Sequence, residues 1–359
     1  MWRRTEGNIL EADVQALVNT VNTVGVTGKG IALQFKKAFP GMFREYEAIC
    51  KANKLHPGQM HVYELGLDDR GITANPRYII NFPTKRHWKG QSKLADIVAG
   101  LNALVDELKR RRITSVAIPP LGCGQGGLDW DEVRPLIERA MERIPEVEAL
   151  IYAPKGSPEP IAMINRTERP ELTPSRANML RLLSEYPILG YELSLLEIHK
   201  ILYFLQVAGE PLRLRFDQGQ YGPYADNLRH VLHRFEGHFI EGFGDGRNNP
   251  RTPIRLIDEA VNEAARVSAE SSTPEQKERV RRVFELIEGF ETPYGMELLA
   301  SAHWVVSQQG VPNEPNAVVD AVQGWNERKR KVMRPDHIRV AWNRLDRLGW
   351  LDQNTTNHD

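Results

Sequence analysis

A proline-rich stretch divides the sequence into two parts with different hydrophobic patterns. Residues 154–174 read PKGSPEPIAMINRTERPELTP, with five prolines and no sustained apolar period. Prolines at this density interrupt helices and sheets, and a chain of 359 residues is long enough for two domains of ordinary size. We therefore predict a first domain at 1–155, a linker at 156–175 and a second domain at 176–359.

The first part alternates between strand and helix patterns. Short runs rich in valine, isoleucine and tyrosine predict strands at 14–18, 59–65, 77–82, 113–119 and 147–153. Apolar residues at three- and four-residue steps predict helices at 94–108 and 133–141. Strands covered by helices on both faces make a three-layer α/β domain, which we expect to form around a mixed central sheet.

The second part has mostly helical patterns, including helical apolar spacing at 195–205. Thr273 followed by Pro274 predicts a helix start, because threonine caps helices and proline suits the first helical position. Residues 339–351 have the pattern of a helix that runs into a short strand, as in winged-helix modules. Gly222-Pro223 predicts a turn between two tyrosines.

Composition excludes several classes of protein. The two cysteines rule out a disulfide-stapled scaffold and a four-cysteine zinc site, and the histidines lack metal-ligand spacing, so we expect no metal. Residues 1–155 hold 22 basic and 18 acidic side chains, whereas the remainder holds 25 and 29. No apolar run suits a membrane span and the N-terminus lacks a signal-peptide core. We expect a soluble, cytoplasmic protein with no membrane partner.

Two glycine-rich loops each follow an apolar strand of the first part. They read GVTGKGIA at 25–32 and GCGQGG at 122–127. Glycine lets backbone N–H groups face a ligand, and a helix N-terminus favours an anion, so the two loops could hold the two phosphates of a pyrophosphate. Neither loop fits the P-loop or the Rossmann pattern. The alternative is that each loop is only a tight connection.

Four motifs within 1–155 resemble the macrodomain family, whose members bind ADP-ribose. They are GNIL at 7–10, LVNTVN at 17–22, TGKGIA at 27–32 and PLGCG at 120–124. Together with NFPTK at 81–85, the NTVN motif resembles the DarG antitoxins, which are paired with DarT toxins. The resemblance implies a hydrolase that removes ADP-ribose from thymidine bases in single-stranded DNA, without a cofactor.

The resemblance also implies roles for individual residues. Adenine contacts fall on Asn8 and Ile9, and the distal ribose is lined by Asn19, Val21, Asn22 and Thr84. The phosphates are cradled by Thr27, Gly28, Lys29, Gly30, Ile31 and Ala32, and by Gly122, Cys123, Gly124, Gln125 and Gly126. Lys85 falls beside the scissile bond. Relatives that reverse glutamate ADP-ribosylation pair this lysine with an aspartate in the second loop, whereas here the nearest carboxylate is Asp129.

Chemistry also favours Lys85 as the catalytic residue. Cleavage of an N-glycosidic bond builds positive charge on the ribose and negative charge on the departing base. A neutral lysine could attack the ribose, whereas a charged lysine could stabilise or protonate the base; burial or the neighbouring Arg86 would lower its pKa. The alternative is that 84–89 is a solvated basic loop, and Lys29 is the competing candidate for catalysis.

Two side chains near these loops have two possible roles each. Trp88 lies between cations, so its ring could stack on a single-stranded base or pack into the core. Cys123 is expected to pack between glycines and not to act as a nucleophile.

In the second part, IHKILYFLQ at 198–206 and YGPY at 221–224 resemble a helical antitoxin domain called Panacea or SocA-like. No catalytic constellation is present there, so we predict a domain that binds the DarT toxin. Two alternatives to the enzyme remain open. One is a non-catalytic ADP-ribose-binding module fused to a protein-interaction domain, and the other is an antitoxin whose macrodomain is vestigial.

Overall fold

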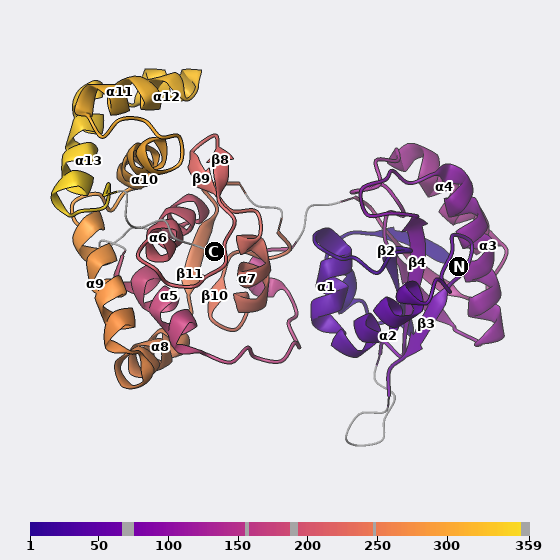
Figure 1. The fold of residues 1–359 in the computed structure, drawn as a ribbon. Helices are drawn as coiled ribbons and strands as arrows, with labels where there is room; N and C mark the ends of the chain where they lie inside the picture. The colour runs from indigo at the N-terminus through magenta and orange to yellow at the C-terminus, as the bar shows by residue number, and fades with distance from the viewer. Residues whose placement is uncertain (67–74, 155–157, 187–192, 247–248, 353–359) are drawn as a thin grey trace. The chain divides into compact units, whose positions relative to one another are not determined.

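The computed structural model describes residues 1–66, 75–154, 158–186, 193–246 and 249–352, which form two compact units (Figure 1). The N-terminal unit comprises Met1–Glu168 and a short segment that starts at Asp245, and the C-terminal unit comprises the rest. Residues 155–157, at the predicted domain boundary, lie outside the described residues. None of the described helices is long and apolar enough to span a membrane.

The N-terminal unit is built on a six-stranded mixed sheet. Its strands are β1 (Trp2–Thr5), β2 (Ala16–Asn22), β3 (His61–Glu64), β4 (Tyr78–Lys85), β5 (Ser115–Ile118) and β6 (Glu148–Tyr152). They are ordered β1-β6-β5-β2-β4-β3. Edge strand β3 runs antiparallel to β4, and all the other neighbours are parallel. The carboxyl ends of β2, β4 and β5 therefore lie along one edge of the sheet.

Helices cover both faces of this sheet. Helices α1 (Gly30–Ala38) and α2 (Pro40–Lys51) share one core with Leu17, whereas α3 (Leu94–Arg110) and α4 (Trp130–Glu142) share the other with Val18. Adjacent residues enter opposite cores because side chains alternate along a strand. The predicted three-layer α/β fold is confirmed. The sequence patterns missed α2, and they missed β1 because its two central residues are exposed arginines.

The path of the chain changes direction at β2. After β2 the chain adds β3 and β4 on one side, and it then returns to the other side of β2 to form β5 and β6. The loop after β2 leads to α1 on one face, and the loop after β5 leads to α4 on the opposite face. Ligands of α/β proteins bind in the crevice that two such diverging loops leave at the carboxyl ends of the strands.

The C-terminal unit is mostly helical, as predicted. Its helices are α5 (Pro174–Glu185), α6 (Leu195–Val207), α7 (Leu228–Phe235), α8 (Asp258–Ser271), α9 (Pro274–Ile287), α10 (Pro293–Ser307), α11 (Pro315–Gly324), α12 (Glu327–Val332) and α13 (Pro335–Arg347). Its short strands are β7 (Leu193–Ser194), β8 (Asp217–Gly219), β9 (Gly222–Tyr224), β10 (Ile240–Glu241) and β11 (Pro253–Leu256). The predicted helix start at Thr273 is confirmed, because its side chain and that of Gln276 form a capping box on α9.

Three local predictions for the later part of the chain were wrong. Residues 349–351 form no strand, because Trp350 and Leu351 are buried in the helical core instead. Gly222-Pro223 belongs to strand β9, and the turn lies at 220–221. The ammonium of Lys200 donates to the Pro223 carbonyl at 2.6 Å, which holds this strand against α6. Pro174, counted in the linker, occupies the first turn of α5, where its missing N–H costs nothing.

Close packing between α3 and β4 generates a stability prediction. A Cβ on Gly100 would lie 2.2 Å from Cζ of the Phe82 ring, so Gly100→Ala forces helix and strand apart. We predict that it lowers the free energy of unfolding of the N-terminal unit by about 1–3 kcal/mol. Val98→Ala, on the exposed side of the same helix, is the control and changes it by less than about 0.5 kcal/mol. Equal stability of the two variants in urea unfolding would contradict this packing.

Candidate active site

The predicted site residues of the N-terminal unit gather at the edge where β2, β4 and β5 end. The first glycine loop leaves β2, the second leaves β5, and Lys85 is the last residue of β4. Lys85 lies opposite Asn22 in the register of β4 and β2. Asn8 and Ile9 follow β1, which runs parallel to these strands through β6 and β5, so they lie along the same edge.

The first glycine loop is held in shape by the side chain of Asn22. Its Oδ1 accepts hydrogen bonds from the N–H groups of Val24 and Val26 at 3.0 and 3.3 Å, and its Nδ2 donates to the Val26 carbonyl at 2.5 Å. The hydroxyl of Tyr46 donates to the Asn22 carbonyl at 2.7 Å, and burial raises the pKa of Tyr46 well above its usual range. Asn22 thus shapes the loop in which Gly28 and Lys29 are exposed.

Helix α1 begins at Gly30, directly after this loop. Gly30 has a φ of +67°, a region that favours glycine. The preceding Lys29 makes no side-chain capping bond, and the first turn of α1 contains no acidic residue. The Gly30 N–H donates to the Asp245 carbonyl at 3.3 Å. The N–H groups that follow it, and the positive dipole end of the helix, suit a negatively charged ligand.

The second glycine loop is packed so tightly that only glycine fits at two positions. A Cβ on Gly126 would lie 2.1 Å from Oγ of Ser92 and 2.4 Å from the carbonyl oxygen of Gly122. Gly122 has a φ of +74°, and a Cβ there would lie 2.9 Å from Leu128. The Ser92 N–H donates to the Gly126 carbonyl at 2.9 Å, which closes the loop against the start of α3. Gly124 and Gln125 remain exposed at its tip.

Lys85 joins strand β4 to the second glycine loop. Its Nζ donates hydrogen bonds to the carbonyl oxygens of Trp88 and Gln125, both at 2.9 Å. Burial lowers the pKa of Lys85. The expected influence of Arg86 is not the cause, because the Arg86 guanidinium forms two hydrogen bonds with Asp96, at 3.0 and 3.1 Å. Lys85 is therefore fixed in place and is not a freely solvated loop residue.

Trp88 follows Lys85 in the segment after β4. The Trp88 side chain is 46% exposed, with Nζ of Lys89 4.9 Å from the ring centroid, so the alternative that it packs into the core was wrong.

Asp129 accepts a hydrogen bond from the Asp131 N–H at 3.0 Å and caps α4. Its carboxylate therefore has a structural use as a helix cap.

The remaining predicted contacts are partly or fully buried. Asn8 caps a short 3₁₀ helix (Ile9–Glu11), and Ile9 lies in the core under α1 and α2. Val21 lies in the same core, and the hydroxyl of Thr84 donates to the Val21 carbonyl at 3.4 Å. Ile31, Ala32 and Cys123 are half-buried. These residues shape the walls of the crevice, and their predicted ligand contacts stay predictions.

Three buried polar atoms around the crevice lack a hydrogen-bond partner among the described residues. They are Oδ1 of Asn19, Oγ1 of Thr27 and Oγ of Ser92. A buried polar atom without a partner is costly, so such atoms are candidates for contact with a ligand or water. Sequence patterns gave no signal for Ser92, because its importance comes from its contact with the second glycine loop.

Comparisons with known proteins agree with this geometry. The Macro domain family profile matches residues 18–137. The DNA ADP-ribosyl glycohydrolase of Thermus aquaticus is 44% identical over 351 residues, which cover 98% of this chain and 94% of the relative. The chain belongs to the DNA ADP-ribosyl glycohydrolase (DarG) family. The DarG-family protein of Mycobacterium tuberculosis is 42% identical, with 94% of this chain and 97% of the relative covered.

Two further matches cover less than half of this DarG-family chain. A DNA ADP-ribosyl transferase–DNA ADP-ribosyl glycohydrolase fusion protein of Thermosipho africanus is 36% identical across 42% of this chain and 41% of the relative. The solved macrodomain of Mycobacterium tuberculosis DarG is 49% identical, with a TM-score of 0.41, across 43% of this chain and 99% of that structure. DarG-family membership makes the chain a glycosidic-bond hydrolase and favours an enzyme over a non-catalytic binding module.

The environment of Cys123 generates a reactivity prediction. Burial raises the pKa of its thiol to about 11, two units above the ordinary value of 9.0. Since only the thiolate reacts, we expect alkylation by iodoacetamide at pH 8 to be about 100-fold slower than for an unperturbed thiol. Peptide mass spectrometry distinguishes Cys123 from Cys50, and the urea-denatured protein serves as the control. A rate equal to that of the denatured chain would contradict the expected inertness.

Proposed function

We propose that this chain hydrolyses the bond between ADP-ribose and thymidine bases of single-stranded DNA, with Lys85 as the catalytic residue. The observation that carries the proposal is the position of the Lys85 ammonium, which two carbonyl oxygens hold between the end of β4 and the second glycine loop. It lies along the same sheet edge as the start of α1, which suits a phosphate.

In the proposed complex, the two glycine loops hold the pyrophosphate. The exposed residues Gly28 and Lys29 meet one phosphate, and the exposed residues Gly124 and Gln125 meet the other. The adenosine end then lies toward Asn8, and the distal ribose lies toward Asn19 and Lys85. This arrangement places the glycosidic carbon at the end of β4.

The hydrogen bonds of Lys85 favour a charged lysine over a neutral nucleophile. An ammonium has three N–H groups; two donate to the carbonyls of Trp88 and Gln125, and the third is available to the departing base. In the proposed step, the C1″–N bond breaks, its electron pair stays on thymine, and Lys85 gives a proton to the base. Water then bonds to C1″ and releases a proton, which restores the charge balance.

The DNA strand would approach over residues 86–89. The exposed Trp88 ring offers a stacking platform, and Lys89 beside it supplies positive charge for the phosphodiester backbone. Aromatic rings between cations are typical of single-strand binding without sequence preference.

We predict that Lys85→Ala lowers the rate of ADP-ribose release from ADP-ribosylated single-stranded DNA by about 100-fold or more. The affinity for free ADP-ribose changes little, because Lys85 lies at the scissile bond and not at the pyrophosphate. Release is measured by chromatography of the nucleotide product, and affinity by calorimetry.

Lys93→Ala is the matched control for this change. Lys93 is an exposed lysine at the start of α3, and its removal is expected to leave the rate within about twofold of the parent protein. If Lys85→Ala keeps more than about a third of the parental rate, Lys85 is not the catalyst.

We further propose that the C-terminal unit binds a DarT-type toxin. This unit has its own hydrophobic core, which contains residues of α5 to α11 and of α13, as an independently folding domain requires. In Thermosipho africanus, a glycohydrolase related to this chain is fused to a DNA ADP-ribosyl transferase, so the two activities are physically linked in at least one relative. The chain would then both restrain the toxin and reverse its product.

A fragment of residues 169–359 tests this division of roles. We predict that it folds, lacks hydrolase activity and co-purifies with a catalytically inactive toxin. The residues after 155 hold an excess of acidic side chains, 29 against 25 basic, and the toxin must hold DNA, so binding should weaken as salt rises. Retention of the toxin only by fragments that contain residues 1–155 would refute the proposal, and the N-terminal fragment 1–168 is the control.

A further inference from the structure

Three polar side chains form a row across the sheet beneath α2. Asn19 of β2, Asn81 of β4 and His61 of β3 lie directly opposite one another in the strand register. Nδ2 of Asn19 lies 2.8 Å from Oδ1 of Asn81, and Nδ2 of Asn81 lies 2.9 Å from Nδ1 of His61. All three side chains are buried, next to the apolar core under α1 and α2. Buried polar groups are costly there unless they bond to one another.

The hydrogen bonds of this row all run in one direction. The Asn81 Nδ2 can only donate, so Nδ1 of His61 accepts and the imidazole proton is on Nε2. Nε2 lies 2.9 Å from Oε1 of Glu45, a carboxylate that accepts this proton's hydrogen bond. Glu45 thereby fixes the tautomer of His61. The Asn81 Nδ2 donates to Nδ1 of His61 and also to Sδ of Met42, at 3.1 Å, so both acceptors orient the Asn81 amide and leave only its Oδ1 to face Asn19.

The inner end of the row is an unsatisfied carbonyl oxygen. Because Asn19 must present Nδ2 to Asn81, its Oδ1 is directed away from Asn81, and it has no partner among the described residues although the residue is only 2% exposed. The pairing of β2 with β5 covers only Ala16 and Leu17. Asn19 therefore lies beyond the paired part of β2 and β5, where the crevice between the two glycine loops starts.

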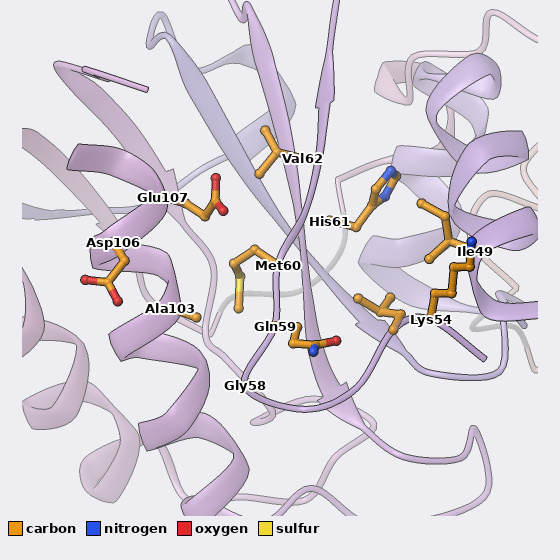
Figure 2. Close-up of a pocket in the computed structure, with 11 residues that line it drawn as sticks. Ile49, Lys54, Gly58, Gln59, Met60, His61, Val62, Ala103, Asp106 and Glu107 are labelled. Carbon is orange, nitrogen blue, oxygen red and sulfur yellow. The ribbon is translucent and has the colours of Figure 1, made fainter. Parts of the chain in front are cut away.

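The outer end of the row meets an open groove at the sheet edge. This groove has a volume of about 570 Å³ and lies between α2 and α3, with His61 among its lining residues. Figure 2 shows His61 on the side of β3 that faces Ile49 of α2. Glu45, at this end, is about half exposed. The row thus connects a solvent-exposed carboxylate to the buried oxygen at the crevice.

We propose that His61 and Asn81 are positioning residues that hold the Asn19 carbonyl oxygen as a hydrogen-bond acceptor for a hydroxyl of the distal ribose of ADP-ribose. This inference rests on the proposed function, because it needs ADP-ribose in the crevice. Without the row, the Asn19 amide turns freely and presents its donor and acceptor ends in either order. A ribose hydroxyl then loses a preorganised acceptor.

Calorimetry with free ADP-ribose on the full chain tests the inference. His61→Leu removes the ring acceptor and is expected to weaken ADP-ribose affinity about fivefold. His61→Asn places Oδ1 where Nδ1 was and is expected to restore the parental affinity within about twofold. Ile79→Val is the control, since Ile79 is buried on the same face of β4 but bonds to no member of the row. It is expected to leave the affinity unchanged.

A double variant shows whether His61 acts through Asn19. In an Asn19→Ala background, His61→Leu should cause no further loss of affinity, because residues that act in one network are not additive. Independent, multiplied effects would overturn the inference, as would equal affinities of His61→Leu and the parent, or a failure of His61→Asn to restore binding. If His61→Leu does not fold, Glu45→Leu at the exposed end is the test, with an expected loss of at least about twofold and refutation if affinity is unchanged.

The outcome also separates this inference from the proposed function. If the parent binds ADP-ribose but releases none from DNA, the proposed function fails while the His61 variants still test the row. If the parent binds no ADP-ribose, both are refuted.

Discussion

The parallel pairing of β2 with β4 on one side and β5 on the other determines where this molecule can act. Three strands end at the same edge, so the two glycine loops and Lys85 meet there although they lie about 40 to 100 residues apart in sequence. The loops after β2 and β5 turn to opposite faces and leave a crevice. Apart from Asn8 and Ile9, which follow β1, the proposed ligand contacts in the N-terminal unit depend on this one arrangement of strands.

Within the crevice, shape and charge come from different residues. Asn22, Tyr46 and Ser92 fix the two loops by hydrogen bonding and packing, and they leave backbone groups exposed. Lys85 supplies a cation whose direction is set by two backbone carbonyls. Preorganised dipoles and a fixed charge need no rearrangement when charge develops in a reaction, which suits cleavage of a glycosidic bond.

Local patterns in the sequence predicted the fold class, the glycine loops and Lys85, because each has a signal within a few residues. The roles of Ser92, Asn81 and His61 could not be found in this way, although Asn81 begins the NFPTK motif. These roles come from strand register and loop packing between distant segments. Pro174 was wrongly assigned to the linker because proline suits both a linker and the first turn of a helix. Gly222-Pro223 was wrongly predicted to form a turn because the Lys200 side chain of α6 holds it in a strand.

The contact between Gly126 and Ser92 restricts how the chemistry of this site can change. Relatives that reverse glutamate ADP-ribosylation are expected to carry an aspartate in this loop, yet here any side chain at position 126 would overlap Ser92 Oγ and the Gly122 carbonyl. An acidic partner for Lys85 at that position therefore requires coordinated substitutions on two segments. A single substitution of Gly126 by aspartate therefore cannot be accommodated unless Ser92 or the backbone of this loop shifts.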